Sequence, residues 1–594
     1  MTTYDFIVVG SGPAGCALAS KLARTNSRPT VLLIEAGENH PETKEIPYGQ
    51  RWQLFQKPDL NWGYQTVPQE HCYERQLDYS RGKCLGGSSV INFGAYTVGC
   101  RDDFEEWARI VDDDHFGWDK MQKRFKDLET FHDAVPVSVN GRKYAAPNLA
   151  DHGSTGPLHV GFAPEWERDV PLMMDAFAKA GHRINPDHNS GNPLGISISI
   201  KSVRKGIVSS AQDLIWDAPE NLSILLNHPV QRVLYDQNRV VGAESNGKRC
   251  RVLTSPITTK KLIKTTLDLA SKEVILSAGA LNTPHILMHS GIGPSSQLAK
   301  FGIPIVHHND AVGQGLRDHF FFSVVLIRKD GSTDRKGFYG DQKAMDIAQK
   351  QWDSDRTGPW TVFGCEQAIG WFKSDEAIRS HEFKALPVHE RAFLERETVP
   401  HFETFANIPI HWFMEDFPPD HPPYTTLTGF PFNAQSRGEV ILQSSDPDVP
   451  LLFDPKVFAH PFDRRMAIIT LRSLLRVAHH PDFKKDTIGV LAGPDSESDS
   501  DLLEYCKRNV ASTWHMCGTA KMGIKQDGKS VVGSDFCVFG VNGLRIADLS
   551  ITPILPNCHT QSTGYAIGTA CAEKLIDEYS LNESSRCFLT KSRL

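Results

Sequence analysis

The sequence predicts an α/β fold joined to an α+β region, and three observations carry that prediction. Residues 4–9 are rich in β-branched and aromatic side chains, as a buried parallel strand requires, and they lead through a glycine turn into a helical stretch at 14–23. A second apolar strand follows at 30–34. From about residue 320 the chain has long aromatic, proline-punctuated stretches with scattered strands such as 439–442, which favours a largely antiparallel sheet. Since 594 residues are too many for one core, two domains of a few hundred residues each are expected.

The glycine turn has the spacing Gly-x-Gly-x-x-Gly and is formed by Gly10, Gly12 and Gly15. Gly10 permits the tight turn, Gly12 lets a phosphate group approach the backbone, and Gly15 lets the helix pack closely on the strand. The helix begins near Pro13 and Ala14, and its N-terminus offers free N–H groups and a positive dipole end to phosphates. The strand, turn and helix together predict a Rossmann-like, dinucleotide-binding domain.

An acidic residue at the end of the second strand supports this interpretation. Glu35 lies twenty residues after Gly15 and is followed by Ala36. A carboxylate there accepts hydrogen bonds from ribose hydroxyls and repels a 2′-phosphate, which argues against NADP. These residues do not distinguish FAD from NAD.

Later segments also have the composition of cofactor-binding loops. Residues 81–92 contain paired glycines and paired serines, which permit close backbone approach and supply several hydrogen-bond donors. Further strands are expected at 222–226, 230–234, 239–244, 272–277 and 543–548, and further helices at 283–289 and 565–579.

Composition and charge argue against several classes of function. The formal net charge is −7 and no long basic run occurs, so nucleic-acid binding is not expected. The twelve cysteines form no C-x-x-C pair, and His389-Glu390 lacks the second histidine of an H-E-x-x-H site, so we expect no metal site. No apolar run approaches the length of a membrane span. The oligomeric state is not predictable from the sequence.

The last three residues, Ser592-Arg593-Leu594, are a conservative variant of the Ser-Lys-Leu peroxisomal address. They predict recognition by the peroxisomal import receptor, and a chance C-terminal tripeptide is the alternative. Only Met1 to Thr3 precede the first strand, which leaves no room for a signal peptide. We therefore expect a peroxisomal or otherwise cytoplasmic protein that is not secreted.

Taken in order, these segments resemble the glucose–methanol–choline (GMC) family of flavin oxidoreductases. Residues 10–15 with Glu35 are similar to its FAD fingerprint, 82–92 to its first signature and 279–293 to its second. Residues 515–522 and 548–561 are similar to its C-terminal catalytic region. Four matches in the same order cover almost the whole chain.

The resemblance implies bound FAD and two domains. It implies a discontinuous FAD-binding domain at 1–155, 222–320 and 535–594, and a substrate-binding domain at 156–221 and 321–534. The residues assigned to FAD by the fingerprint and by the resemblance are Gly10, Gly12, Pro13, Ala14, Gly15, Glu35, Ala36, Arg81, Gly86, Gly87, Ser88, Asn92, Gly94, Ala95, Val230, Ala278, Gly279, Asp548, Leu549, Thr560 and Gln561.

Within that set, the resemblance implies particular neighbours for the parts of the cofactor. It implies that Val230 lies near the adenine, residues 92–95 near the isoalloxazine ring, and Asp548 near the pyrophosphate or ribityl chain. Members with covalent flavin carry a histidine just before the signature asparagine. That position is Ile91 here, so we expect FAD to be bound non-covalently.

Alcohol oxidation through a flavin moves a hydride to flavin N5 and the hydroxyl proton to a base. The base must be neutral near pH 7 and hold the proton afterwards, which points to histidine. His515 and His559 lie in matched family motifs, and we expect His515 to be the base and His559 to hydrogen-bond the same oxygen. The expected partners are a small-molecule alcohol and O₂ or another electron acceptor.

Several alternatives remain open at this stage. An oxidase that passes electrons to O₂ is the first hypothesis, and a dehydrogenase that reduces a quinone or another acceptor is the second. A non-redox lyase or cyclase of secondary metabolism is the third, and a flavin-binding protein without turnover is disfavoured by the two histidines. The sequence does not identify the alcohol, and family analogy does not extend to the divergent pocket residues.

A cationic substrate is a further hypothesis. An anion beside aromatic rings could bind a quaternary ammonium such as choline. Glu403 and the aromatic residues Trp360, Phe363, Trp371 and Trp412 lie in the expected substrate-binding domain. Ordinary core aromatics are the favoured interpretation of these residues.

Overall fold

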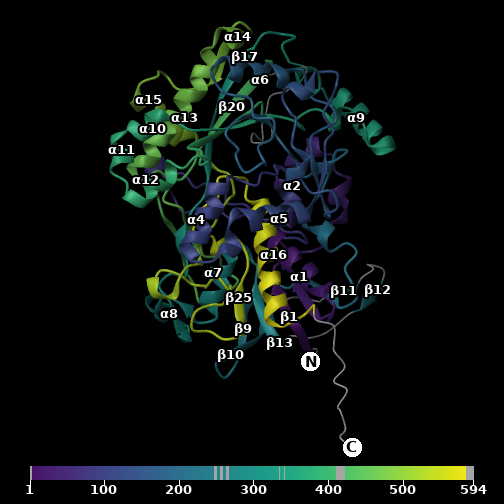
Figure 1. Cartoon of the computed structure of the whole chain (residues 1–594), viewed down its shortest axis with the longest axis vertical. Coiled ribbons are helices and arrows are strands. Elements are labelled where there is room, and N and C mark those ends of the chain that lie inside the picture. The colour runs from purple at the N-terminus through teal and green to yellow at the C-terminus, as the bar shows by residue number, and fades with distance from the viewer. Residues whose placement is uncertain are drawn as a thin grey trace, which may run out of the picture.

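The chain is seen in a computed structural model that describes residues 3–245, 251–254, 259–261, 267–333, 335–339, 341–409 and 422–582. Two sheets dominate the described residues. Figure 1 shows the larger sheet with α1, α7 and α16 in the lower half of the molecule, and the second sheet with α13 in the upper half. The described helices are α1 (Pro13–Ala23), α2 (Trp52–Phe55), α3 (Ser88–Ile91), α4 (Arg101–Val111), α5 (Trp118–Leu128), α6 (Asp169–Lys179), α7 (Gly279–His289), α8 (Ser295–Lys300), α9 (Gln342–Asp355), α10 (Asp375–Arg379), α11 (His381–Lys384), α12 (Val388–Leu394), α13 (Pro461–His479), α14 (Pro481–Lys484), α15 (Asp499–Asn509) and α16 (Gln561–Glu578).

The larger sheet has nine strands, and its centre is parallel. The parallel strands, in spatial order, are β8 (Leu222–Leu226), β2 (Val31–Ile34), β1 (Thr3–Val9), β13 (Leu267–Leu276) and β25 (Leu544–Ile546). Antiparallel strands flank them, namely β11 (Arg251–Thr254) and β12 (Thr259–Lys261) beside β8, and β10 (Arg239–Ser245) and β9 (Val230–Asp236) beside the first half of β13. In β2 and in most of β1 every side chain is buried, as expected for parallel strands covered on both faces.

Two helices lie against each other on this sheet because small residues let their backbones approach. Gly568 of α16 lies so close to α1 that a Cβ there would be 2.0 Å from the carbonyl oxygen of Ala14. The two helices are the purple and yellow ribbons side by side in Figure 1. The first helix and the last helix of the described chain are therefore packed together next to the glycine turn.

The second sheet has six strands, and all its pairings are antiparallel. Its strands are β18 (Ala368–Phe372), β19 (Phe402–Ala406), β20 (Tyr424–Pro431), β17 (Phe320–Arg328) and β23 (Thr487–Ala492), with β24 (Ala511–Ser512) paired to the start of β17. Gly429 of β20 packs against Thr470 and Leu474 of α13, and the next residue, Phe430, faces the opposite side. The sheet is thus covered by α13 on one face and turns aromatic side chains to a cavity on the other.

The predicted fold class, Rossmann-like α/β with a largely antiparallel α+β region, is confirmed. The described strands of the larger sheet all come from the ranges 1–155, 222–320 and 535–594. Those of the six-stranded sheet lie in 321–534, apart from the first residue of β17, Phe320. The division into two domains at these boundaries stays a prediction.

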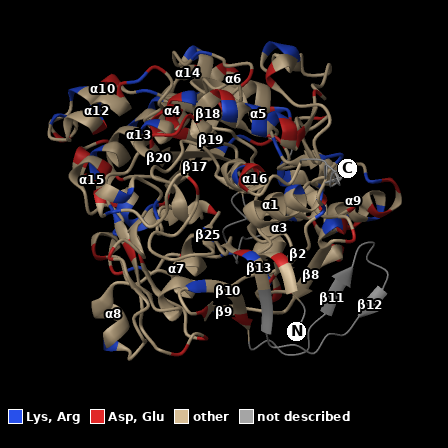
Figure 2. Cartoon of the chain, turned by 60° about the horizontal axis from the view of Figure 1, so that its bottom comes forward, with Lys and Arg blue, Asp and Glu red and all other residues tan. Residues whose placement is uncertain are grey.

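Two helices begin about one turn earlier than the hydrophobic pattern predicts, at Gly279 and Gln561, whereas α1 begins within one residue of its predicted start. Gly279, Asn282, Gln561 and Gly564 line a cavity, so these first turns lack the apolar periodicity of a helix that faces the core. Charged residues of both signs are interspersed along the outer helices α9, α10, α12 and α15 (Figure 2). Some form ion pairs between helices, for example Arg472 of α13 with Glu376 of α10 at 2.5 Å.

Candidate active site

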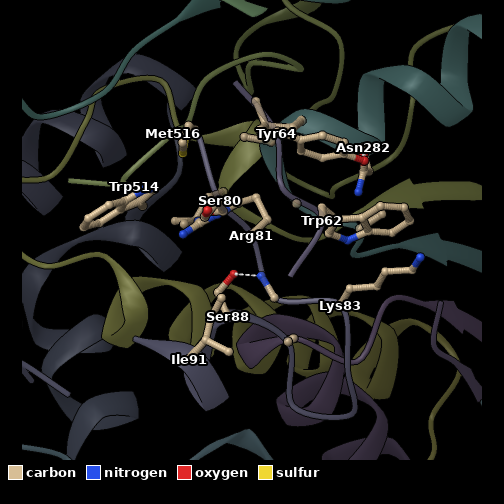
Figure 3. A pocket seen from close by; sticks show the side chains of 18 of the residues that line it. Trp62, Tyr64, Ser80, Arg81, Lys83, Ser88, Ile91, Asn282, Trp514 and Met516 are labelled. Carbon is tan, nitrogen blue, oxygen red and sulfur yellow. Dashed lines mark hydrogen bonds between the residues drawn. The ribbon is translucent and has the colours of Figure 1, made fainter. Parts of the chain in front are cut away.

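One cavity of about 980 Å³ runs between the two sheets. At one end it is lined by the glycine turn after β1 and by Val230 of β9, and at the other by Phe405 and Phe430 of the six-stranded sheet. Figure 3 shows its middle, where Arg81, Ser88 and Ile91 lie between the Trp62 and Tyr64 side and the Trp514 side. We call the first end the nucleotide end and the second the catalytic end.

The three glycines of the turn have different structural roles. Gly10 has a φ of +98°, and a Cβ there would lie 2.4 Å from the Ser277 carbonyl oxygen. A Cβ at Gly15 would lie 1.9 Å from the Gly10 carbonyl oxygen, so only glycine lets α1 start this close to β1. A Cβ at Gly12 would meet nothing within 4 Å, because this residue faces the cavity. The three predicted roles agree with these positions.

Three helices point their N-termini at the cavity. The first residues of α1, α7 and α16 line it, together with Thr560, which precedes α16. The first N–H groups of a helix have no partner within the helix, and the positive end of the helix dipole lies there. The nucleotide end therefore has the backbone donors and the positive potential that a pyrophosphate needs.

Two buried carboxylates are held by hydrogen bonds at the nucleotide end. Glu35 Oε2 accepts from the backbone N–H and the hydroxyl of Ser11 at 3.0 and 2.6 Å, and Oε1 accepts from the Gly37 N–H at 2.9 Å. Asp548 Oδ2 accepts from the Gly279 N–H at 2.9 Å and from the Thr283 hydroxyl at 2.6 Å. Burial raises the pKa of both groups above its ordinary value, although these hydrogen bonds oppose the rise. Both residues line the cavity, and their remaining lone pairs can accept from ribose or ribityl hydroxyls.

The first signature segment is tied to the glycine turn and closes the side of the cavity. The Gly86 N–H donates to the Ser11 carbonyl at 3.1 Å, and a Cβ at Gly87 would lie 2.8 Å from the Gly12 Cα. The Ser88 hydroxyl accepts from the Gly82 N–H at 3.0 Å. Two segments that are separated by seventy residues in the sequence thus form one surface.

The segment 92–95 is held to the start of α16. The Asn92 side chain donates to Gln561 Oε1 at 3.1 Å and accepts from the Gly94 N–H at 3.0 Å. Gln561 Nε2 donates to the Ala95 carbonyl at 2.7 Å. This network places residues 92–95, the predicted neighbours of the isoalloxazine ring, beside the start of α16. His559 lies just before that helix.

Almost all of the residues predicted for FAD lie on this cavity. Those that line it are Gly10, Gly12, Pro13, Ala14, Glu35, Ala36, Arg81, Gly87, Ser88, Asn92, Gly94, Ala95, Val230, Ala278, Gly279, Asp548, Leu549, Thr560 and Gln561. Gly15 and Gly86 do not line it, and they act through packing, Gly15 against the Gly10 backbone and Gly86 against the side chains of Val90 and Gln212. The open Gly12 and Gly279, the helix N-termini and the two carboxylates fit a flavin dinucleotide.

His515 and His559 face each other at the catalytic end. Their ring centroids are 5.0 Å apart and the rings are nearly perpendicular, at 87°. His515 is 8% exposed, and its backbone N–H donates to Asp318 Oδ1 at 2.7 Å. Burial, and then the nearby His559, His319 and Arg81, hold the pKa of His515 well below its ordinary value. The imidazole is therefore neutral at pH 7.

A third histidine, His319, contacts His515. The two Nδ1 atoms are 3.0 Å apart, so one of them carries the proton and the other accepts it. If His515 donates, its Nε2 is unprotonated and can act as a base, whereas the reverse arrangement puts a proton on that atom. His319 itself is fully buried and stacks on Phe432, with ring centroids 4.3 Å apart.

His559 is oriented by a buried carboxylate. Its Nε2 lies 2.9 Å from Glu403 Oε1, and its backbone N–H donates to the Thr97 hydroxyl at 2.7 Å. Glu403 is 1% exposed, so this hydrogen bond is shielded from water. Glu403 comes from β19, far from His559 in the sequence, and only the folded chain brings them together.

None of the three described aromatic residues suggested for a cationic substrate lines the cavity, and only Trp371 lies beside Glu403, directly opposite it across β18 and β19. Trp360 and Phe363 pack in a separate cluster with Phe338, and Trp371 packs on His188. Trp412 lies outside the described residues. The interpretation of the three described residues as ordinary core aromatics agrees with these positions.

Sequence reasoning missed three residues at the catalytic end, namely His319, Lys201 and Gln367. Lys201 and Gln367 line the cavity and hydrogen-bond each other at 2.6 Å. Lys201 follows the alternating Ile and Ser residues of 196–200 at a position where a polar side chain is expected, so the pattern does not mark it. No sequence signal marks the other two.

Two features are absent from the part of the chain that the structure describes. Within it, no group of three or more His, Cys, Asp or Glu side chains is arranged to hold a metal ion. No helix in those ranges is both long enough and apolar enough to cross a bilayer.

Comparison with known proteins identifies the family. The sequence model of the N-terminal part of GMC oxidoreductases matches residues 4–321, and that of the C-terminal part matches residues 434–568. The chain is 29% identical over 595 residues to glucose methanol choline oxidoreductase atC of Aspergillus terreus, covering 97% of this chain and 93% of that protein. It is 28% identical over 617 residues to patulin synthase of Penicillium expansum, covering 98% and 92% respectively.

Solved structures give the same result. A variant of Aspergillus oryzae formate oxidase, in a study of FAD modification, has a TM-score of 0.85 and 25% identity, covering 98% of this chain and 99% of that one. A fungal aryl-alcohol oxidase has a TM-score of 0.79 and 25% identity, covering 97% and 99%. The chain therefore belongs to the GMC oxidoreductase family, and its cofactor is FAD.

Proposed function

We propose that this protein oxidises an alcohol to an aldehyde or a ketone and passes the electrons to O₂, which gives H₂O₂. The alcohol loses a hydride and a proton, and O₂ gains two electrons and two protons. The observation that carries the proposal is the pair of imidazoles 5.0 Å apart on the same cavity as the dinucleotide fingerprint. Bound FAD supplies the hydride acceptor.

His515 is the proposed base. It takes the hydroxyl proton at Nε2, which is unprotonated when Nδ1–H donates to His319. The low pKa of His515 keeps the imidazole neutral before the reaction, so no proton has to leave it first. Removal of such a base lowers the rate by roughly 10² to 10⁴ in typical enzymes.

His559 is proposed to hydrogen-bond the same substrate oxygen. The Glu403 carboxylate accepts a hydrogen bond from Nε2–H, and Nδ1–H of the protonated imidazole then donates to the substrate oxygen. A second polar group at the oxygen stabilises the charge that develops as the proton leaves. Phe405 and Phe430 lie within about 6 Å of the His559 ring centroid, and they exclude water from the oxygen.

The electron acceptor differs among the similar proteins, so this part of the proposal needs its own test. The similar proteins include dehydrogenases of Emericella nidulans and Hericium erinaceus, and oxidases of formate and of aryl alcohols. The test is an anaerobic screen for bleaching of the flavin by primary aliphatic, aryl and amino alcohols. The active alcohol is then used to compare H₂O₂ yield in air with dye reduction without oxygen.

The outcomes of this screen separate the candidates. Stoichiometric H₂O₂ supports the oxidase, whereas fast dye reduction with little H₂O₂ identifies a dehydrogenase. Failure of every alcohol to bleach the flavin would contradict both and favour a non-redox lyase or cyclase.

The flavin is proposed to be dissociable. Ile91, which lines the cavity just before Asn92, has no nucleophilic atom for a covalent link. Acid precipitation is expected to release all yellow colour into the supernatant. A yellow pellet after precipitation would overturn this proposal.

We propose a peroxisomal location from the C-terminal Ser592-Arg593-Leu594, which lies outside the described residues. An oxidase fits that compartment, because catalase there removes H₂O₂. A fluorescent fusion with a free C-terminus is expected to be punctate and to become diffuse without the tripeptide. A diffuse intact fusion would exclude the address.

A further inference from the structure

We propose that the Lys201 ammonium forms a subsite for a carboxylate carried by the alcohol substrate. The proposal rests on the proposed function, because it assumes that the alcohol is oxidised at the catalytic end of the cavity. The ligand class is an alcohol with its hydroxyl at the two histidines and an anionic group about one aromatic ring away.

The backbone of Lys201 is fixed at the wall of the cavity. It follows β5 (Gly195–Ile198), and it exchanges two backbone hydrogen bonds of 2.9 Å with Gly161. It also forms a β-bridge with Ala95, which belongs to the segment predicted to lie near the isoalloxazine ring. The residue is 4% exposed and lines the cavity, so its side chain has little freedom to reach bulk water.

The ammonium has no ion-pair partner among the described residues. Its hydrogen bond there goes to Gln367 Oε1, a neutral acceptor, at 2.6 Å. An ammonium has three N–H donors, so donors remain for a ligand. A buried charge without a counterion carries a desolvation penalty that a ligand of opposite charge relieves.

Two carboxylates act on Lys201 from a distance, those of Glu366 and Glu403. Glu366 accepts hydrogen bonds from the Ser199 hydroxyl at 2.6 Å and the Ala163 N–H at 2.9 Å, and Glu403 is paired with His559. Both raise the pKa of Lys201, but burial outweighs them and lowers that pKa to about 8. The charge therefore persists at neutral pH without being neutralised by direct contact.

One phenyl ring connects Lys201 to the histidine pair. The ammonium lies 5.0 Å from the centroid of the Phe405 ring, and that centroid lies 5.9 Å from the centroid of His559. The ammonium is also 5.6 Å from the centroid of Tyr48. Aromatic faces stabilise this cation and provide a flat wall for the apolar part of a substrate.

The positive charge of Lys201 favours an anionic substrate, whereas Glu403 and the aromatic residues alone suggested a cationic one. Glu403 is engaged with His559, and the cation position beside the aromatic ring is taken by Lys201. A quaternary ammonium such as choline would be repelled. A hydroxy acid would be attracted.

The first experiment needs no variant. Flavin difference spectra of the wild-type holoenzyme measure the binding of para-toluate and of its neutral counterpart para-toluamide, neither of which carries an alcohol. We expect para-toluate to bind at least tenfold more tightly. Equal affinity, or tighter binding of the amide, would overturn the subsite.

The second experiment measures anaerobic flavin reduction by para-(hydroxymethyl)benzoate and by para-(hydroxymethyl)benzamide. Lys201→Met keeps the length of the side chain and removes its charge. It is expected to weaken the apparent affinity for the benzoate by about tenfold to a hundredfold, as loss of a hydrogen bond to a charged group does, with little change for the benzamide. Lys201→Arg is expected to retain much of the preference, and Lys123→Met, on an exposed lysine of α5, is the matched control.

The outcomes separate this inference from the proposed function. Equal weakening of both substrates in Lys201→Met would mean that Lys201 has only a structural role, and would overturn the subsite. If no alcohol reduces the flavin but para-toluate still binds more tightly than the amide, the proposed oxidation fails and the anion subsite stands.

Discussion

The two ends of the cavity are built in different ways. The nucleotide end is made largely of main-chain groups, such as the glycine turn and the N-termini of α1 and α7. The catalytic end is made of side chains from distant parts of the chain, with Lys201, His319, Glu403, His515 and His559 brought together by the second sheet and its connections. A main-chain site depends on local glycine spacing, whereas a side-chain site depends on how separate segments pack.

The electrostatics of the two ends differ for the same reason. At the nucleotide end, the positive potential comes from helix N-termini and not from titratable side chains. At the catalytic end, burial holds His515 neutral and leaves Lys201 as a cation without an ion-pair partner among the described residues. The nucleotide end is therefore suited to a permanently charged anion, and the catalytic end to proton transfer.

The strongest test of this separation is His515→Ala. It is expected to lower the rate of anaerobic flavin reduction by at least a hundredfold, because the proton of the alcohol loses its acceptor. FAD content, measured by absorbance, should stay at the wild-type level, since His515 belongs to the catalytic end. A near-normal reduction rate in this variant would contradict the assignment.

Gly15→Ala should affect the nucleotide end alone. Its Cβ would lie 1.9 Å from the Gly10 carbonyl oxygen, so α1 must move away from β1. We expect a loss of about 1–3 kcal/mol in the free energy of unfolding and a reduced FAD content, measured by thermal denaturation and absorbance. Gly337→Ala is the matched control, because a Cβ at Gly337 meets nothing within 4 Å. Unchanged stability and FAD content in Gly15→Ala would contradict the packing role.

Glu403→Gln should have a smaller effect on the catalytic end. It preserves the shape of the side chain but removes the charge that orients His559. We expect flavin reduction to slow by about fivefold, since hydrogen bonds to charged groups are stronger than neutral ones by about 1 kcal/mol. The exposed Glu397→Gln provides a control that should be neutral. Equal rates in the two variants would show that Glu403 does not act on the reaction.

The smallest expected effect is that of pH on the reductive step. A histidine with a lowered pKa stays neutral at all pH values above that pKa, and it becomes protonated only in more acidic solution. Since burial holds the pKa of His515 well below 6.5, the limiting rate of flavin reduction should be constant between about pH 6 and about pH 8. A fall to half the maximum near pH 6.5, measured by stopped flow, would show that His515 titrates normally.

The sequence predictions were accurate where the signal is local, and less accurate where residues face the cavity. The strands at 222–226 and 230–236 and the glycine turn were predicted closely, because apolar runs and glycine spacing are local signals. The starts of α7 and α16 were placed too late, because their first turns face the cavity and lack apolar periodicity. Resemblance to a family, and not local pattern, pointed to His515 and His559.

The sequence by itself determined the Rossmann-like α/β unit, the dinucleotide site and the two candidate histidines. Only the tertiary structure decided what surrounds those histidines. His319, Glu403 and Lys201 come from segments more than eighty residues apart, and no local pattern relates them. Their charges and protonation follow from burial and from contacts between the packed segments, which exist only once the chain has folded.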